Sequence, residues 1–443
     1  MLKIGFILPS SDYLFDPFKG DPHTHFQILT VLEDYFNKEV NLTLIDLRGI
    51  KRDFAINHIF ECDVFLYSVY TLDFNEQVSI VNNLRNHYPK SIHIAGGPHA
   101  SVCQEECLKI FDSIILGDGE ESIIQAIEDI KKLKLQKVYR MQNIIDINKY
   151  PIPSRKFLPK SVVARKKMMT LKNKKGFDEL RGTTVIFSRG CTGRCAFCAM
   201  PQVRKYGTPG VRYRKPKYIE AEIEYLKQEY NMQGINLLDE IGIPPDDQMA
   251  IPHLEAIGRT GIKWRGQCRV DGITPEIAKL AWESGCVALG LGVESVSQLS
   301  LDILNKDISI ERAKQTIFLL KQNGIEPRIY MILGLPGEPE NIVEQTWSFI
   351  KETSPDLVVL SLFTVRPGTE IYINPQKYGI EHINTEWSNT MHMFGRYEEE
   401  KIPNISFKFD KNPPWGRAFT NDQIVDNYME LQSRLRDSGL SFL

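Results

Sequence analysis

The sequence contains no apolar run that approaches the roughly 20 residues of a membrane-spanning helix, so no transmembrane segment is expected. The apolar stretch at the start of the chain is also too short for a signal peptide. Lysine and arginine (54) nearly balance aspartate and glutamate (56), and the net charge of −2 gives no overall field that would attract nucleic acid or an anionic membrane. We expect a cytoplasmic chain for which nucleic acid is not a partner.

Cysteine is also sparse, with eight residues unevenly placed among 443, and this argues against a disulfide framework. Cys103 and Cys107 lie four residues apart and would face one way on a helix. A second metal site needs more ligands than these two, so we expect them to be structural.

Three other cysteines stand together in the string Ser188-Arg-Gly-Cys-Thr-Gly-Arg-Cys-Ala-Phe-Cys198. Cys191, Cys195 and Cys198 follow the spacing C-x3-C-x2-C. Three thiolates on one short loop can ligate three irons of a four-iron, four-sulfur cluster and leave the fourth iron open. Zinc is the alternative, but it would need a fourth ligand, and no second cysteine pair follows at a suitable spacing. We predict that these three cysteines are metal ligands.

Two parts of the chain alternate short apolar runs with helical patterns, which predicts an α/β fold. Residues 1–135 read as a doubly wound, Rossmann-like domain with a parallel sheet. Residues 183–375 contain six strand–helix units, fewer than a closed barrel needs, and predict a partial (β/α)6 barrel. Between them, residues 136–182 form a basic linker. We expect residues 376–443 to form a small, mostly helical region that caps the barrel.

Small and polar residues follow three predicted strands of the first domain. Ligands of doubly wound sheets bind at the carboxyl ends of the strands, so these residues are candidates for cofactor binding. They are Ser68, Thr71, Gly96, Gly97, Pro98, Gly117, Gly119 and Glu120.

The cysteine spacing, with Phe197 just before the last cysteine, resembles the signature of the radical S-adenosylmethionine (radical SAM) superfamily. The resemblance implies a partial barrel whose cysteine loop follows the first strand. It also implies that the open iron binds SAM, and that one electron splits SAM into methionine and a 5′-deoxyadenosyl radical.

Further segments resemble the superfamily at the ends of later barrel strands. The resemblance implies that Asp239 or Glu240 contacts the SAM amine, that Arg269 pairs with its carboxylate, and that a fourth strand end meets its ribose. A fifth strand end would lie along the adenine. The residues implied at these last two ends are Glu294, Ser295 and Gly334. Tyr330 on the fifth strand is a candidate catalytic residue that would face the substrate, and the alternative is a tyrosine of the barrel core.

A doubly wound domain ahead of such a barrel resembles the cobalamin-binding radical SAM enzymes, over residues 1 to about 370. The strings Ala95-Gly-Gly-Pro-His-Ala100 and Gly117-Asp-Gly-Glu120 carry the resemblance, with the linker string Pro151-Ile-Pro-Ser-Arg155. Some cobalamin domains use D-x-H-x-x-G, but Asp21-Pro-His23-Thr-His25-Phe26 lacks the glycine. We therefore expect no histidine ligand to cobalt, and a lower face covered by a side chain from 70–74.

The resemblance implies a cobalamin-dependent radical SAM methyltransferase that moves a methyl group through methylcobalamin to an unactivated carbon. The implied cofactors are a 4Fe-4S cluster, SAM and cobalamin. A cyclase, oxidase or rearrangement enzyme on the same scaffold is an alternative, as is a non-catalytic cobalamin or iron–sulfur carrier. The expected partners are a small-molecule, lipid or peptide substrate and an electron donor such as flavodoxin or ferredoxin.

Overall fold

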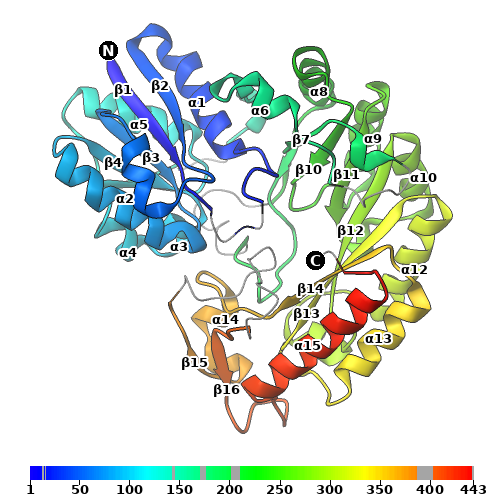
Figure 1. The fold of residues 1–443 in the computed structure, drawn as a ribbon. Coiled ribbons are helices and arrows are strands. Elements are labelled where there is room, and N and C mark those ends of the chain that lie inside the picture. Colours follow the sequence, from blue (N-terminus) through cyan, green and yellow to red (C-terminus); the bar gives the residue numbers. More distant parts are fainter. Residues whose placement is uncertain are drawn as a thin grey trace.

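The computed structural model describes residues 1–11, 14, 16–141, 145–169, 176–200, 210–386 and 403–441. These residues form two α/β units that lie side by side, with the linker and the C-terminal region packed against them (Figure 1). The α/β prediction is therefore confirmed. The predicted domain boundaries remain predictions.

The first unit is a six-stranded sheet in the order β2-β1-β3-β4-β5-β6, with every neighbouring pair parallel. Its strands are β1 (Leu2–Leu8), β2 (Val40–Asp46), β3 (Val64–Ser68), β4 (Ile92–Gly96), β5 (Ser113–Leu116) and β6 (Val138–Arg140). Its helices are α1 (His23–Phe36), α2 (Phe74–His87), α3 (Pro98–Val102), α4 (Gln104–Leu108) and α5 (Glu120–Lys131).

Burial on both faces explains why these strands read as continuous apolar runs. All five residues of β3 are buried. Leu29 of α1 and Ile127 of α5 belong to the core on one face, while Val81 of α2 and Cys107 of α4 belong to the core on the other. Helices on both faces of a parallel sheet define the doubly wound arrangement that the alternation predicts.

The second unit is an open six-stranded parallel sheet in the order β14-β13-β12-β11-β10-β7, which confirms the partial barrel. Its strands are β7 (Gly182–Val185), β10 (Gly234–Leu237), β11 (Lys263–Cys268), β12 (Cys286–Glu294), β13 (Glu326–Leu333) and β14 (Leu357–Leu362). Its helices are α8 (Pro216–Tyr230), α9 (Asp247–Arg259), α10 (Pro275–Glu283), α11 (Gln298–Ile303), α12 (Ile310–Gln322) and α13 (Ile342–Thr353).

The remaining elements are short, except for the last helix. A two-stranded antiparallel pair, β8 (Ser188–Arg189) and β9 (Arg212–Tyr213), follows β7. The linker contains α6 (Lys160–Ala164), and α14 (Glu370–Ile373) follows the barrel. The C-terminal region contains the antiparallel pair β15 (Ile380–Ile383) and β16 (Phe407–Phe409), which the sequence did not predict, and then α15 (Asn421–Asp437). Helix α15 packs along α13 and the last barrel strands (Figure 1).

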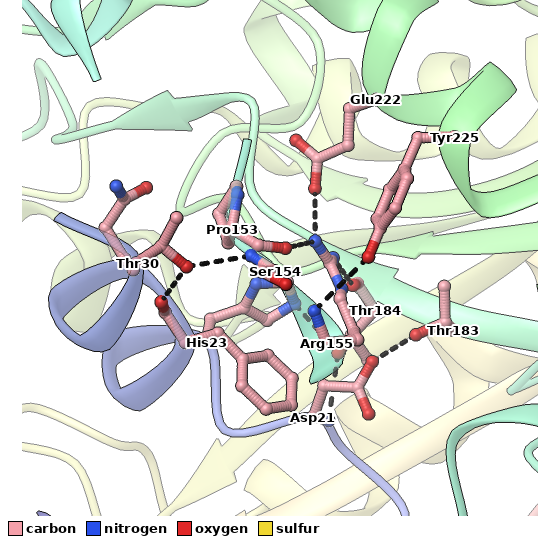
Figure 2. A network of polar contacts seen from close by, with 12 residues as sticks. Asp21, His23, Thr30, Pro153, Ser154, Arg155, Thr183, Thr184, Glu222 and Tyr225 are labelled. Carbon is pink, nitrogen blue, oxygen red and sulfur yellow. Dashed lines mark hydrogen bonds and ion pairs between the residues drawn. The ribbon is translucent and has the colours of Figure 1, made fainter. Parts of the chain in front are cut away.

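Arg155 of the linker is fully buried and ties the linker to the barrel (Figure 2). Its Nη1 donates to Glu222 Oε1 of α8 at 2.8 Å and to the Pro153 carbonyl at 2.6 Å, and its Nη2 donates to the Thr184 carbonyl of β7 at 3.1 Å. Because both charges are buried and the guanidinium is bonded on several sides, the geometry offsets much of their desolvation.

The loop before α1 joins the same strand of the barrel (Figure 2). Buried Asp21 accepts hydrogen bonds from the Thr183 hydroxyl and from the Lys166 ammonium, and its backbone N–H donates to Thr184 Oγ1 at 2.9 Å. His23 Nε2 lies 2.9 Å from the same hydroxyl oxygen. The first domain and the linker are thus locked onto β7, which fixes their position relative to the barrel.

Among the described residues, no helix combines the length and the apolar character that crossing a bilayer would require.

Candidate active site

A cavity of about 510 Å³ lies between the two units. On one side it meets the carboxyl ends of β3, β4 and β5, and on the other it meets the loops that follow β7 and β10. In both units the carboxyl ends of the strands, where parallel sheets bind ligands, therefore face the same cavity.

Most of the predicted residues of the first domain line this cavity. They are Ser68, Gly96, Gly97, Pro98, Gly117, Gly119 and Glu120. Gly97 has φ +94°, and a Cβ there would lie 2.8 Å from the Val69 nitrogen, so a side chain would strain this turn. Thr71 does not line the cavity; its Oγ1 lies 3.1 Å from His99 Nδ1.

An ion cluster crosses the cavity between the two units. Arg189 Nη1 bonds to Asp118 Oδ1 at 2.9 Å, Arg189 Nη2 bonds to the Glu120 carboxylate, and Arg212 Nη1 lies 2.9 Å from Asp118 Oδ2. All four residues line the cavity. Because Arg189 stands two residues before Cys191, the cluster fixes the start of the cysteine loop against the first domain.

The cysteine loop lies at the carboxyl end of β7, beside the cavity. Cys198 lines the cavity, whereas Cys195 is 8% exposed. A Cβ on Gly193 would lie 3.4 Å from Cys191 Sγ and 3.6 Å from Cys195 Sγ, so these sulfurs flank one glycine. Ala196 donates its N–H to the Leu304 carbonyl at 2.8 Å, which anchors the loop to the barrel.

The spacing of the three sulfurs bears on the choice between cluster and zinc. The sulfurs of Cys191, Cys195 and Cys198 do not all lie within 4.8 Å of one another. A single ion would need its ligands that close, whereas a four-iron cluster is larger and needs them farther apart. The arrangement favours the cluster.

Cys195 and Cys198 of this loop lie in a medium that disfavours the charged form of their thiols. Burial raises the pKa of Cys198 to about 11. Burial also raises the pKa of Cys195, although the nearby Lys306 and Arg269 charges oppose the shift. A positively charged centre would hold these two sulfurs as thiolates, and a metal cluster supplies one.

Two carboxylates follow β10 next to the cysteine loop. Glu240 Oε2 accepts a hydrogen bond from the Gly190 N–H at 3.2 Å, and Glu240 lines the cavity. Asp239 is buried, and its Oδ1 accepts from the Phe187 N–H at 3.1 Å, while its Oδ2 has no hydrogen-bond partner. Burial raises the pKa of Asp239 to about 7. An unpaired buried oxygen is costly, so this position suits a ligand that donates a hydrogen bond.

Arg269 and Glu294 lie on the other side of the loop. Arg269 forms a bidentate pair with Asp271, with Nε–Oδ1 and Nη2–Oδ2 both at 2.9 Å, and its Nη1 would be 3.0 Å from a Cβ on Gly193. Glu294 has φ +67°, and its Oε1 accepts from Lys306 Nζ at 3.0 Å. The two predicted residues are thereby brought to the cysteine loop, together with Lys306, which the sequence did not reveal.

The predicted residues of the fourth and fifth strand ends form turns. Ser295 Oγ accepts from the Ser297 N–H at 3.1 Å. Gly334 has φ +88°, and its N–H donates to Glu338 Oε2 at 2.9 Å. Glu338 Oε1 is buried without a partner. The turn after β13 thus depends on a buried carboxyl group.

This carboxyl group makes stability depend on pH. Burial raises the pKa of Glu338 to about 8, despite opposing hydrogen bonds from the Gly334 and Leu335 N–H groups. The folded chain then binds this proton more tightly than the unfolded chain, whose value is 4.5. The contribution of Glu338 to the free energy of unfolding therefore falls as pH rises from 4.5 to 8. We expect urea titrations at several pH values across that range to show that the free energy of unfolding falls less steeply with pH in Glu338→Gln than in the wild-type chain. An unchanged slope with pH would contradict the assignment.

Tyr330 on β13 faces the interior of the barrel. A Cβ on Gly290 of β12 would lie 2.5 Å from the Tyr330 hydroxyl, so the glycine leaves room for the ring. Arg328, two residues earlier on the same strand, donates Nη1 to the Met169 carbonyl of the linker at 2.6 Å. Tyr330 is not among the residues that line the 510 Å³ cavity.

Both histidines of the Asp21–Phe26 string are accounted for by contacts within the protein. His25 Nε2 lies 3.0 Å from the Ile7 carbonyl oxygen, and His23 Nε2 is held by Thr184. Burial lowers the pKa of His23 to about 3 and that of His25 to about 4, so both are neutral. Tyr70 lines the cavity and is 48% exposed.

Comparison with known proteins decides the nature of the second unit. Residues 185–350 match the radical SAM superfamily. The chain carries a radical SAM domain. This match covers the barrel from β7 to α13 and includes the cysteine loop, so the resemblance inferred from C-x3-C-x2-C is confirmed.

Two curated relatives extend the similarity beyond the radical SAM domain. A bacteriochlorophyllide d C-12(1)-methyltransferase of Chlorobaculum tepidum is 25% identical over 316 residues, which cover 70% of this chain and 65% of the relative. An anaerobic magnesium-protoporphyrin IX monomethyl ester cyclase of Rubrivivax gelatinosus is 31% identical over 190 residues, which cover 42% of this chain and 33% of the relative. The chain thus spans less than two thirds of either relative's length.

A solved structure shares the whole architecture. The radical SAM methyltransferase TsrM from Kitasatospora setae, solved with cobalamin and a [4Fe-4S] cluster bound, superposes with a TM-score of 0.69. The match covers 100% of this chain and 90% of TsrM at 14% identity. At that identity the likeness shows the fold, which includes both the doubly wound domain and the radical SAM domain.

The described residues fit the cofactors that this fold implies. The radical SAM domain offers three thiols on one loop and, beside them, the unpaired Asp239 Oδ2 and the Arg269 guanidinium. The first domain offers a cavity lined by glycines and by Ser68, whose buried hydroxyl has no hydrogen-bond partner. Thiolates suit iron, and glycines let a large flat ligand approach the backbone.

Proposed function

We propose that this chain is a cobalamin-dependent radical SAM methyltransferase. The observation that carries the proposal is one cavity lined both by Cys198 of the radical SAM domain and by the Gly96-Gly97-Pro98 turn of the first domain. A ligand at the ends of β3 to β5 would face the cysteine loop directly, as methyl transfer between two cofactors requires. The similarity to a bacteriochlorophyllide methyltransferase and to TsrM supports the same reaction class.

When bound, a 4Fe-4S cluster with SAM supplies a radical, and cobalamin supplies a methyl carrier. The chain's residues bind and orient these groups and exclude water. Cys191, Cys195 and Cys198 would hold the cluster. The residues proposed for SAM are Asp239, Glu240, Arg269, Glu294, Ser295 and Gly334, and those proposed for cobalamin are Ser68, Gly96, Gly97, Pro98, Gly117, Gly119 and Glu120. Tyr330 would face the substrate.

A cyclase is the second candidate, because the relative with 31% identity is a cyclase. The two reactions differ in the fate of the SAM methyl group. We expect that SAM carrying an isotope-labelled methyl group, incubated anaerobically with the chain, hydroxocobalamin and a reductant, will transfer the label to the cobalamin recovered from the protein. Release of 5′-deoxyadenosine with no label on cobalamin would favour the cyclase.

The reaction needs a reductant and a substrate. Flavodoxin or ferredoxin is the class of electron donor that we propose. A small molecule, a lipid or a peptide could be the substrate, and the resemblance of part of the chain to tetrapyrrole enzymes favours the first of these.

Filling the cavity will weaken cobalamin binding. Gly96 lines the cavity, and a Cβ there meets nothing nearer than Ile115 at 3.8 Å, so Gly96→Leu adds a side chain without a clash at its Cβ. We expect the hydroxocobalamin dissociation constant, measured by absorbance titration, to rise at least about tenfold. Gly20→Leu is the control, because a Cβ there meets nothing within 4 Å and Gly20 does not line the cavity. Equal affinities in the two variants would contradict the proposed location.

A further inference from the structure

A group of possible metal ligands lies in the first domain, outside the cavity. The ligand atoms of His99, Cys103 and Glu106 all lie within 4.8 Å of one another. None of the three residues lines the cavity. They are spaced by four and three residues along two short helices that meet at Cys103, whose backbone (φ −117°, ψ 53°) is not helical. Cys103 stands at the break, where α3 ends and α4 begins.

His99 is oriented toward the other two residues. Its side chain is fully buried, its backbone N–H donates to the Val69 carbonyl at 3.0 Å, and its Nδ1 lies 3.1 Å from Thr71 Oγ1. Its Nε2 has no hydrogen-bond partner and lies 3.5 Å from Glu106 Oε2. One ring nitrogen is therefore anchored by a neighbour while the other faces a carboxylate and a thiol, which is how metal-ligating histidines are held.

We propose that His99, Cys103 and Glu106 form a zinc site. Imidazole nitrogen, thiolate sulfur and carboxylate oxygen are the three ligand types of protein zinc sites, and the mixture excludes hard cations such as magnesium or calcium. Three protein ligands leave one tetrahedral position, which a water molecule would occupy. The spacing in the sequence paired Cys103 with Cys107, whereas the fold gathers His99 and Glu106 around Cys103.

The position of the site suggests what the ion does. Gly97 and Pro98, which line the cavity, directly precede His99. Val102, between His99 and Cys103, lies against Gly368 of the segment that leads into α14, where an added Cβ would come within 2.5 Å of it. Tyr372 of α14 packs against the hydrophobic core of the first domain to which Ala100 and Cys107 belong. An ion here would brace the turn after β4 and its contact with the second unit, whatever reaction the cavity supports.

Zinc binding to the full chain tests the proposal. The chain is purified anaerobically with its iron–sulfur cluster reconstituted, equilibrated with Zn²⁺ and dialysed, and metals are counted by mass spectrometry. We expect about one zinc per wild-type chain, and zinc K-edge absorption that shows one sulfur ligand with nitrogen and oxygen. C103A will bind zinc at least about a hundredfold more weakly, and Thr71→Val about tenfold more weakly. Cys107→Ala, one turn along the same segment, is the matched control and will retain the ion.

The cysteine loop must be excluded as the zinc ligand. A variant with C191A, C195A and C198A will still bind about one zinc, which separates this site from the proposed function. The proposal is overturned if wild-type chain retains no zinc, if Cys103→Ala and Cys107→Ala retain equal amounts, or if the absorption spectrum shows three sulfur ligands. The wild-type spectrum decides even if a variant fails to fold.

Discussion

Cys195→Ala will abolish the iron–sulfur cluster and reduce 5′-deoxyadenosine formation to background. Cys195 is the central cysteine of the loop and is only 8% exposed, so solvent cannot replace its sulfur easily. The loop itself will keep its place, because the Ala196 N–H donates to the Leu304 carbonyl and the Ala196 carbonyl accepts from the Ile371 N–H at 3.2 Å. Iron analysis, absorbance and product assay after anaerobic reconstitution measure the result.

A second buried cysteine provides the control for this experiment. Cys62 is 2% exposed and belongs to the core of the first domain, away from the cysteine loop. Cys62→Ala loses the same sulfur atom at a buried position and will retain about four irons per chain. A Cys195→Ala variant that still binds four irons and cleaves SAM at the wild-type rate would remove the basis for the cluster assignment.

Arg155→Met will destabilise the fold by about 3–5 kcal/mol. The substitution removes the guanidinium that Glu222 contacts at 2.8 Å, and Glu222 is 1% exposed, so its charge would be left buried without a partner. It also removes the donor to the Thr184 carbonyl of β7. Unfolding in urea, followed by circular dichroism, measures the loss, which will come from the transition that includes the barrel.

The double variant Arg155→Met with Glu222→Leu distinguishes the cost of an orphaned charge from the loss of packing. If the buried carboxylate is the main penalty, the double variant will be more stable than Arg155→Met alone, although it carries one more substitution. If the destabilisation of the double variant equals the sum of those of Arg155→Met and Glu222→Leu measured singly, the ion pair contributes mainly through its position in the linker.

The alternation of apolar runs and helical patterns was sufficient to predict the second sheet and five of the six strands of the first. Both sheets are built largely from the short apolar runs of this alternation, such as β3 (Val64–Ser68) and β14 (Leu357–Leu362). The pattern failed for β6, β8, β9, β15 and β16. Four of these strands, β6, β8, β9 and β16, have only two or three residues, which is too short for a period of two to stand out.

The residues that lie beside the proposed cofactor positions were predictable only where a motif contained them. Gly96, Gly97 and Glu240 stand in motifs at strand ends and line the cavity. Lys306 does not belong to such a motif, and Arg189 stands in the cysteine string without any sign there of its partner. Arg189 is 69 residues from its partner Glu120, and only the packing of one domain on the other brings them together. Lys306 pairs with Glu294 because the backbone bends at Glu294, where φ is +67°.

A crystal structure of the chain, grown anaerobically with SAM and hydroxocobalamin, would test the central claim most directly. We expect the corrin ring to lie in the cavity between the ends of β3 to β5 and the cysteine loop. We also expect SAM to lie on a cluster held by Cys191, Cys195 and Cys198, near Arg269. Cobalamin bound elsewhere, or a metal on this loop that leaves no position for SAM, would contradict the claim.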